Sequence, residues 1–248
     1  MTSTHTREPI LNVPPIMVAT LAALALIHAV RWFLPRSADI ELLLLFAFIP
    51  ARYDAGILAG AVWPGGFPAD VWTFVSYALL HGDLMHLGFN AIWLLAFGTP
   101  LARRFGPLRF LAFCAVTAAA GALAHLATHF GQMAPMVGAS ATISGAMAAA
   151  MRFAFHSGSP LRFGGNDDAY RVPALPLRDA LRDTRVLAFL AVWFGLNLLF
   201  GLGSISMTGN EQPVAWQAHV GGFLAGLMLF SLFDPINPHR PDVPPATA

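Results

Sequence analysis

The chain has 248 residues, of which 56% are hydrophobic and 11% are charged, and its formal net charge is +1. A soluble domain carries roughly 25% charged residues, so this composition excludes an ordinary globular enzyme and indicates an integral membrane protein. A net charge near zero gives no support to a nucleic-acid partner. There is no lysine and only one cysteine, Cys114, which excludes a serine–lysine mechanism, a Schiff base and an internal disulfide.

Six apolar stretches are long enough to cross about 30 Å of hydrocarbon as helices of roughly 20 residues. They contain neither aspartate nor glutamate and cover residues 15–34, 84–102, 108–130, 139–156, 186–203 and 215–233. The first is too long for the apolar region of a signal peptide, which favours a retained span. We therefore predict an all-α, six-helix membrane bundle over residues 15–234, between a short polar tail (1–14) and a proline-rich, disordered tail (235–248).

The distribution of arginine predicts the orientation, because loops rich in positive charge stay in the cytoplasm. The loops after the second and fourth spans, with their edges, contain Arg103, Arg104, Arg109, Arg152, Arg162, Arg171, Arg178, Arg182 and Arg185. This places both termini in the cytoplasm and makes the second, fourth and sixth spans run inward from the outer face. Arg31, Arg36 and Arg52, around the first outer loop, count against this orientation.

The first outer loop, about residues 35–83, contains an apolar segment, Leu42–Ile49, that is too short to span the membrane. Together with Trp63, Trp72 and Tyr77 it is expected to lie at the membrane surface, since Trp and Tyr favour that boundary. No transit segment is evident, which favours a bacterial plasma membrane over an organelle.

A serine opens the fourth span. Gly138 lets the loop turn tightly into the helix, and Ser140 then lies in the first turn, where free backbone N–H groups can stabilise a negative oxygen. Polar residues at this depth are costly and suggest function. The competing interpretation is helix packing, because Ala, Ser and Gly are the usual small residues at contacts between membrane helices.

A histidine opens the sixth span. His219 shares a helix face with Gly222, and Gly222 with Gly226 forms a pattern of small residues that lets another helix approach closely. If that partner is the fourth span, the imidazole reaches Ser140. The alternative is a structural histidine bonded to a loop carbonyl.

The second span begins with two further polar residues on one helix face, His86 and Asn90. Both can donate hydrogen bonds, and donors aimed at a developing oxyanion contribute roughly 3–4 kcal/mol each in hydrolases. The alternative is that Asn90 bonds a neighbouring helix and His86 lies at the interface. His81 is expected to be structural.

The absence of other motifs narrows the chemistry. The sequence contains no HExxH motif, and its spans contain no aspartate, so zinc and aspartyl proteolysis of those types are not supported. A serine–histidine dyad remains. It would lack a carboxylate to orient the imidazole, so packing against neighbouring helices would have to hold the ring. His125 and His129, four residues apart, could bind a metal but lack a third ligand in their span, which favours packing. We expect no metal and no cofactor.

These motifs together resemble the rhomboid family of intramembrane serine proteases, with a match over roughly residues 15–234. The resemblance implies a six-span fold, Ser140 as nucleophile and His219 as general base. It implies an oxyanion hole from the Ser140 N–H, His86 and Asn90. It also implies that Gly222 and Gly226 pack the sixth span on the fourth.

The sequence departs from the family pattern at three positions. Ala141 replaces the last glycine of GxSG, and Ser144 replaces an aromatic residue that stacks on the histidine. Ser144 could itself be argued as nucleophile, although it lies one turn deeper. Ala102 stands where the family often has a glutamate, which puts a loop tether in doubt.

The resemblance implies an endopeptidase that cleaves transmembrane helices of membrane proteins near their outer ends. Trp193, Phe194 and Phe200 of the fifth span and the loop 204–214 are the candidates for a lateral gate and cap. The alternative function is an inactive rhomboid-like protein that binds membrane clients. A transporter or channel predicts acidic residues or repeats near the midplane, which the sequence does not contain.

Overall fold

The computed structural model describes residues 13–57, 63–154, 172–201 and 214–236, and within them all regular structure is helical. The one strand-like pairing there is an isolated bridge between Phe48 and Met136. The elements are α1 (Pro15–Phe33), α2 (Arg36–Phe46), η1 (Pro50–Tyr53), α3 (Gly66–Ser76), η2 (Tyr77–Leu79), α4 (Leu84–Trp93), η3 (Leu94–Gly98), α5 (Thr99–Phe105), α6 (Pro107–His129), α7 (Ser140–Ala150), α8 (Leu177–Ala180), α9 (Thr184–Gly201) and α10 (Trp216–Phe233). The predicted all-α fold is confirmed.

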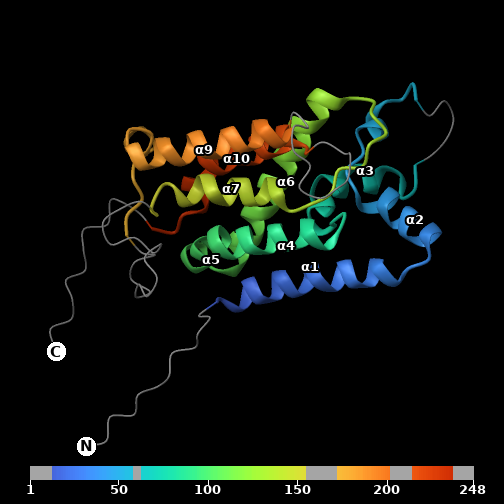
Figure 1. Ribbon diagram of the computed structural model, residues 1–248, viewed down its shortest axis with the longest axis horizontal. Helices are drawn as coiled ribbons and strands as arrows, with labels where there is room; N and C mark the ends of the chain where they lie inside the picture. The colour runs from blue at the N-terminus through green and yellow to red at the C-terminus, as the bar shows by residue number, and fades with distance from the viewer. Residues whose placement is uncertain (1–12, 58–62, 155–171, 202–213, 237–248) are drawn as a thin grey trace, which may run out of the picture.

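The helices form a bundle in which α7 is central. In Figure 1, α7 lies between α4 and α5 on one side and α9 and α10 on the other, with α1 beyond α4. The helices α4, α7 and α10 all begin at the end of the bundle where α2 and α3 lie, whereas α1 begins and α10 ends at the opposite end (Figure 1). The three helices that open with candidate polar residues therefore start at one end.

Four helical segments are long and apolar enough to cross a membrane: Pro15–Phe33, Leu84–Phe105, Pro107–His129 and Trp216–Phe233. Helix α9 counts as a shorter apolar helix over the described range Thr184–Leu199. The multi-pass character is thus confirmed, while four segments, not six, reach full length among the described residues.

The fourth predicted span differs most from expectation. Helix α7 has 11 residues where we expected a helix over 139–156, and at 1.5 Å per residue it rises only about 16 Å. Every residue from Ala141 to Ala150 is buried. A helix enclosed by protein meets no lipid, so its length does not have to match the bilayer.

Local sequence explains where the second span begins and ends. Asp83 caps α4 by accepting a hydrogen bond from the backbone N–H of His86 at 2.7 Å. A π-helical turn, η3, joins α4 to α5, so the helical segment runs without a break to Phe105. Gly106, with φ +74°, ends it, and Pro107 begins α6 at a position where a missing N–H costs nothing.

Two glycines of α10 allow it to touch the backbone of α7. A Cβ at Gly222 would collide with the carbonyl oxygen of Ala141, and one at Gly226 with that of Gly145. The two pairs advance along both chains together, so α7 and α10 run parallel. This register places their first turns, which contain Ser140 and His219, side by side.

Helix α6 closes the same core from a third direction. A Cβ at Gly121 would lie 2.5 Å from the Cβ of Ala141 and 2.9 Å from the carbonyl oxygen of Ala218. One turn away, a Cβ at Gly145 would lie 2.5 Å from Cγ2 of Thr117. Ala141 has a methyl group where the GxSG pattern has glycine. That methyl group fits between α7 and α6 because Gly121, opposite it, has no side chain.

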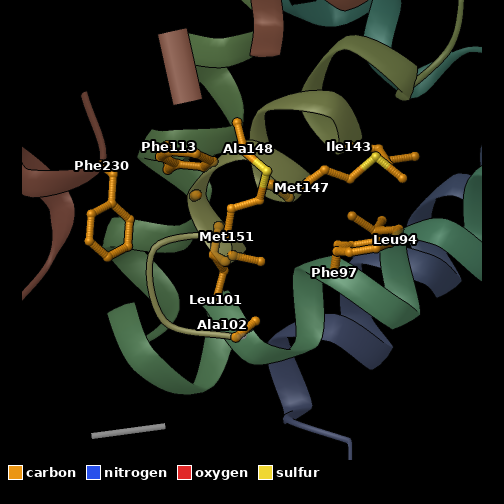
Figure 2. Packing of buried hydrophobic residues seen from close by; sticks show 14 of the residues in the cluster. Leu94, Phe97, Leu101, Ala102, Phe113, Ile143, Met147, Ala148, Met151 and Phe230 are labelled. Atoms are coloured by element: carbon orange, nitrogen blue, oxygen red, sulfur yellow. The ribbon is translucent and has the colours of Figure 1, made fainter. Parts of the chain in front are cut away.

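The largest apolar cluster of buried side chains is contributed by α1, η3, α5, α6, α7, α9 and α10. Figure 2 shows part of it: Leu94, Phe97, Leu101, Ala102, Phe113, Ile143, Met147, Ala148, Met151 and Phe230. Ala102 is 3% exposed within this cluster. The position of the family's glutamate is thus an apolar core position in this chain.

A buried ion pair ties α5 to the end of α10. Arg104 donates to both carboxylate oxygens of Asp234, at 2.9 and 2.8 Å, and also to the carbonyl oxygen of Val172 at 2.8 Å. Arg152 donates to the carbonyl oxygen of Leu175 at 2.6 Å. Two arginines therefore hold the segment before α8.

The predicted surface segment of the outer loop forms α2, which is joined to α3. Trp72 donates from its indole N–H to the carbonyl oxygen of Leu45 at 2.8 Å.

Two of the arginines that counted against the orientation have acidic partners: Arg31 lies 2.7 Å from Asp39, and Arg52 lies 3.2 Å from Asp70. Both arginines are therefore held by acidic side chains, of α2 and α3 respectively.

The first prediction concerns the contact of α10 with α7. Gly226→Ala should lower the free energy of unfolding by about 1–3 kcal/mol, because the methyl group forces two backbones apart. Gly195→Ala in α9 is the matched control, since a Cβ there meets nothing within 4 Å. Denaturant titration in detergent micelles measures both, and equal stability of the two variants would contradict the proposed contact.

The second prediction concerns the buried ion pair. Asp234→Asn should cost about 3–5 kcal/mol of stability, because it removes a hydrogen-bonded negative charge from beside the buried Arg104 guanidinium. Asp183→Asn is the control: Arg185 lowers the pKa of the Asp183 carboxyl below its ordinary value, but the pair is exposed to solvent. Thermal unfolding should separate the two variants, with no measurable change for Asp183→Asn.

Candidate active site

The loop that leads into α7 is fixed by its neighbours. Gly138 has φ +119°, a conformation that side-chain-bearing residues rarely adopt, and its N–H donates to the carbonyl oxygen of Tyr77 at 3.0 Å. Two residues earlier, Met136 exchanges backbone hydrogen bonds with Phe48. The outer loop thereby sets the direction in which the chain enters α7 and the position of its first residue, Ser140.

The structure brings Ser140 and His219 into direct contact. The hydroxyl oxygen of Ser140 lies 2.7 Å from Nε2 of His219, which is the length of a good hydrogen bond. The two residues come from the first turns of α7 and α10, and both side chains are partly exposed. A hydroxyl and an imidazole from two different helices are therefore paired by a hydrogen bond.

A third residue, which no sequence motif indicated, completes the hydrogen-bonded chain. Oδ1 of Asn197, on α9, lies 2.6 Å from Nδ1 of His219, and the Asn197 amide N–H donates to the carbonyl oxygen of Trp193 at 2.8 Å. We expected packing alone to hold the imidazole, but a polar partner faces it. The available signal was a lone amide within an otherwise apolar span, which is costly unless it has a partner.

His86 and Asn90 lie against the loop before Ser140. A Cβ at Gly138 would be 2.6 Å from Nε2 of His86 and 3.6 Å from Nδ2 of Asn90. Asn90 is 5% exposed, and its Nδ2 has no hydrogen-bond partner among the described residues. A buried donor without an acceptor is costly. Both donors thus lie beside the N-terminus of α7, where its free N–H groups point.

The other candidate residues have different surroundings. The Ser144 hydroxyl donates to the Ser140 carbonyl at 2.8 Å and is buried, so it bonds within its own helix. The rings of His125 and His129 stack at 4.2 Å, and the described part of the chain contains no group of three potential metal-ligating side chains. His81 is fully buried, with its ring centroid 5.1 Å from that of His86.

The residues proposed for a gate fall into two groups. Trp193 is buried and stacks on Phe223 of α10 at 4.4 Å, so it fastens α9 to α10. Phe194, next to it, is 43% exposed. The side chain of Phe200 and the loop residues 204–213 lie outside the described residues, as do residues 1–12 and 237–248 of the predicted tails.

Chemically, the site contains the parts of an acyl-transfer centre. A hydroxyl is hydrogen-bonded to an imidazole, the imidazole is hydrogen-bonded on its other nitrogen, and the unpartnered Nδ2 of Asn90 lies near Gly138, in the loop that leads to the hydroxyl. A base that is itself oriented by a third group is the arrangement that activates a weak nucleophile. The three groups come from α7, α10 and α9, so the site depends on tertiary packing.

Comparison with known proteins places this arrangement in a family. The family model described as Rhomboid domain matches residues 68–234, which is more than half of the chain. The Rhomboid protease GlpG of Enterobacter sp. (strain 638) is 28% identical over 79 residues, which cover 31% of this chain and 28% of that protein. The matched stretch is therefore a minor part of that relative. On the extent of the domain match, this multi-pass membrane protein belongs to the rhomboid family.

Proposed function

We propose that this protein is an intramembrane serine endopeptidase that cleaves membrane proteins with Ser140 as nucleophile and His219 as general base. The observation that carries the proposal is the 2.7 Å contact between the Ser140 hydroxyl and Nε2 of His219. Membership of a family that includes a rhomboid protease supports the same reaction class. No step of the reaction requires a metal or a cofactor.

In the first half of the reaction, the Ser140 oxygen attacks the carbonyl carbon of the scissile peptide bond while Nε2 of His219 takes the hydroxyl proton. The carbonyl oxygen becomes an oxyanion. His219 then gives the proton to the leaving amine as the C–N bond breaks, and an acyl-enzyme remains on Ser140. Water, activated by the same imidazole, releases the acid and restores the hydroxyl.

The oxyanion is stabilised by three donors: the backbone N–H of Ser140, the His86 ring and the Asn90 amide. Ser140 is the first residue of α7, so its N–H has no acceptor within the helix. The unpartnered Nδ2 of Asn90 supports this role, because a buried donor kept free is available to a charge that exists only during the reaction.

The substrates are transmembrane helices with small or helix-breaking residues near their outer ends. A helix hides its peptide bonds in its own hydrogen bonds, so the chain must unwind locally before Ser140 can reach a carbonyl carbon. The exposed apolar face of α9, which includes Phe194, is where such a helix approaches. The arginine-rich loops support an orientation with both termini in the cytoplasm. We propose a bacterial plasma membrane as the location of the protein.

The third prediction tests the nucleophile. A serine-reactive fluorophosphonate should label the wild-type protein at Ser140, and Ser140→Ala should lower cleavage of a model membrane substrate by at least about 10³-fold. Ser144→Ala is the matched control, since it removes a hydroxyl one turn further along the same helix. Loss of activity in Ser144→Ala with retention in Ser140→Ala would reverse the assignment. Absence of both cleavage and labelling in the wild type would favour an inactive protein that binds membrane clients.

The fourth prediction tests the oxyanion hole. Asn90→Ala should lower kcat by about 10²–10³-fold with little change in KM, because the donor acts on charge that develops only in the transition state. Steady-state kinetics with a fluorogenic peptide in detergent measure the two constants separately. A rise in KM at constant kcat would instead assign Asn90 to substrate binding.

A further inference from the structure

We propose that Asn197 is the positioning residue for His219: its side-chain oxygen holds the proton on Nδ1 and leaves Nε2 free to take the proton of Ser140. This inference rests on the proposed function and adds the group that the catalytic dyad otherwise lacks. It starts from a polar residue that the reaction as described above does not use. The hydrogen bonds around Asn197 determine which atom of each group donates and which accepts.

The contact with Trp193 shows which terminal atom of the Asn197 side chain is the nitrogen and which is the oxygen. The carbonyl oxygen of Trp193 lies 2.8 Å from one terminal atom of this side chain and can only accept a hydrogen bond. That atom must therefore be the amide nitrogen. The other terminal atom, which faces His219, is then the oxygen, and the helix backbone has fixed the orientation of the amide.

The orientation of the Asn197 amide determines which nitrogen of the His219 imidazole carries the proton. An amide oxygen can only accept, so Nδ1 of His219, 2.6 Å away, must be the donor. In a neutral histidine the proton on Nδ1 leaves a lone pair on Nε2. The Ser140 hydroxyl, 2.7 Å from Nε2, then donates to that lone pair, which is the arrangement needed for general-base catalysis.

A positive charge forms on His219 during the proposed reaction. When His219 takes the Ser140 proton it becomes a cation, and the Asn197 oxygen still accepts from Nδ1. Among the described residues, the side chains hydrogen-bonded to the His219 ring are Ser140 of α7 and Asn197 of α9. The amide provides a dipole without bringing a charged carboxylate into the apolar bundle, which would be costly.

The same contact explains how the chain functions without the family's aromatic residue at position 144. Ser144 is too short to stack on the ring and instead donates to the Ser140 carbonyl at 2.8 Å. The ring of His219 is held by its edges: Nε2 faces Ser140 and Nδ1 faces Asn197. Two directed hydrogen bonds replace one stacking contact.

The experiment compares four variants of the full chain in detergent micelles. Asn197→Leu and Asn197→Ala remove the acceptor, Asn197→Asp retains an oxygen toward His219, and Leu198→Ala is the control on an exposed neighbour in the same helix. We expect the first two to lower kcat, and the rate of fluorophosphonate labelling at Ser140, by about 10²–10⁴-fold with KM unchanged, since a wrong tautomer costs about 10⁴ in a serine protease. Asn197→Asp should recover activity to within about tenfold of the wild type.

A structural role would give a different pattern. In that case all substitutions of Asn197 would lower thermal stability together and Asn197→Asp would recover nothing. Rates for Asn197→Leu and Asn197→Ala within threefold of the wild type would also overturn the proposal, as would an Asn197→Asp variant as slow as Asn197→Leu.

A second measurement does not depend on protease activity. In ¹⁵N NMR of histidine-labelled protein, with His219→Gln used to identify the His219 signals, the wild type should show a proton on Nδ1 and none on Nε2. Asn197→Leu should shift part of the population to the other tautomer. An unchanged spectrum would overturn the inference about Asn197. A wild type that shows the expected tautomer but neither cleaves nor labels would overturn the proposed function alone.

Discussion

The site depends on the contact between the backbones of α7 and α10. Because Gly222 and Gly226 have no side chains, the two helices approach until their backbones touch, at Ala141 and Gly145. Because the two helices are this close and run parallel, Ser140 and His219 can form a hydrogen bond although they are 79 positions apart in the sequence. A side chain at either glycine would collide with the backbone of α7 and force the two helices apart. The packing of small residues and the chemistry are therefore one feature, not competing interpretations of the same motif.

A second chain of contacts would fix the direction of proton transfer in the proposed reaction. It begins at a backbone carbonyl in α9, passes through the Asn197 amide and the His219 ring, and ends at the Ser140 hydroxyl. Each group in this chain has its donor or acceptor role set by the one before it, and the first is a carbonyl that cannot change its role. The order of the chain explains how a membrane-embedded site can orient a base without a buried carboxylate.

The sequence was sufficient for much of this structure because its signals are local. Long apolar stretches without acidic residues predict helices, and the positions of Ser140, His219, His86 and Asn90 at helix starts follow from where those stretches begin. The start of α4 at Leu84 is set by a capping aspartate next to it. Helix starts, helix caps and the polar residues beside them were predictable because each depends on residues only a few positions away in the sequence.

Features that depend on distant parts of the chain were not predictable in the same way. The shortness of α7 follows from its enclosure by other helices, which an apolar stretch does not reveal. Arg104 finds Asp234 across 130 positions, so its tethering role could not be inferred from the neighbouring Ala102. Asn197 was missed for the same reason: its partner is on the next helix, and a single amide in an apolar run has no spacing pattern that assigns it.

The position of Asn197 gives α9 two roles that constrain each other. The helix exposes apolar side chains such as Phe194 to the membrane, yet it is fastened to α10 by the stacking of Trp193 on Phe223 and by the hydrogen bond to His219. Moving α9 away from α10 would separate Asn197 from the imidazole while leaving the contact between α7 and α10 intact. The base would then keep its place beside Ser140 but lose the group that sets its tautomer. The proposed reaction therefore requires α9 to be packed against α10 when the proton is transferred.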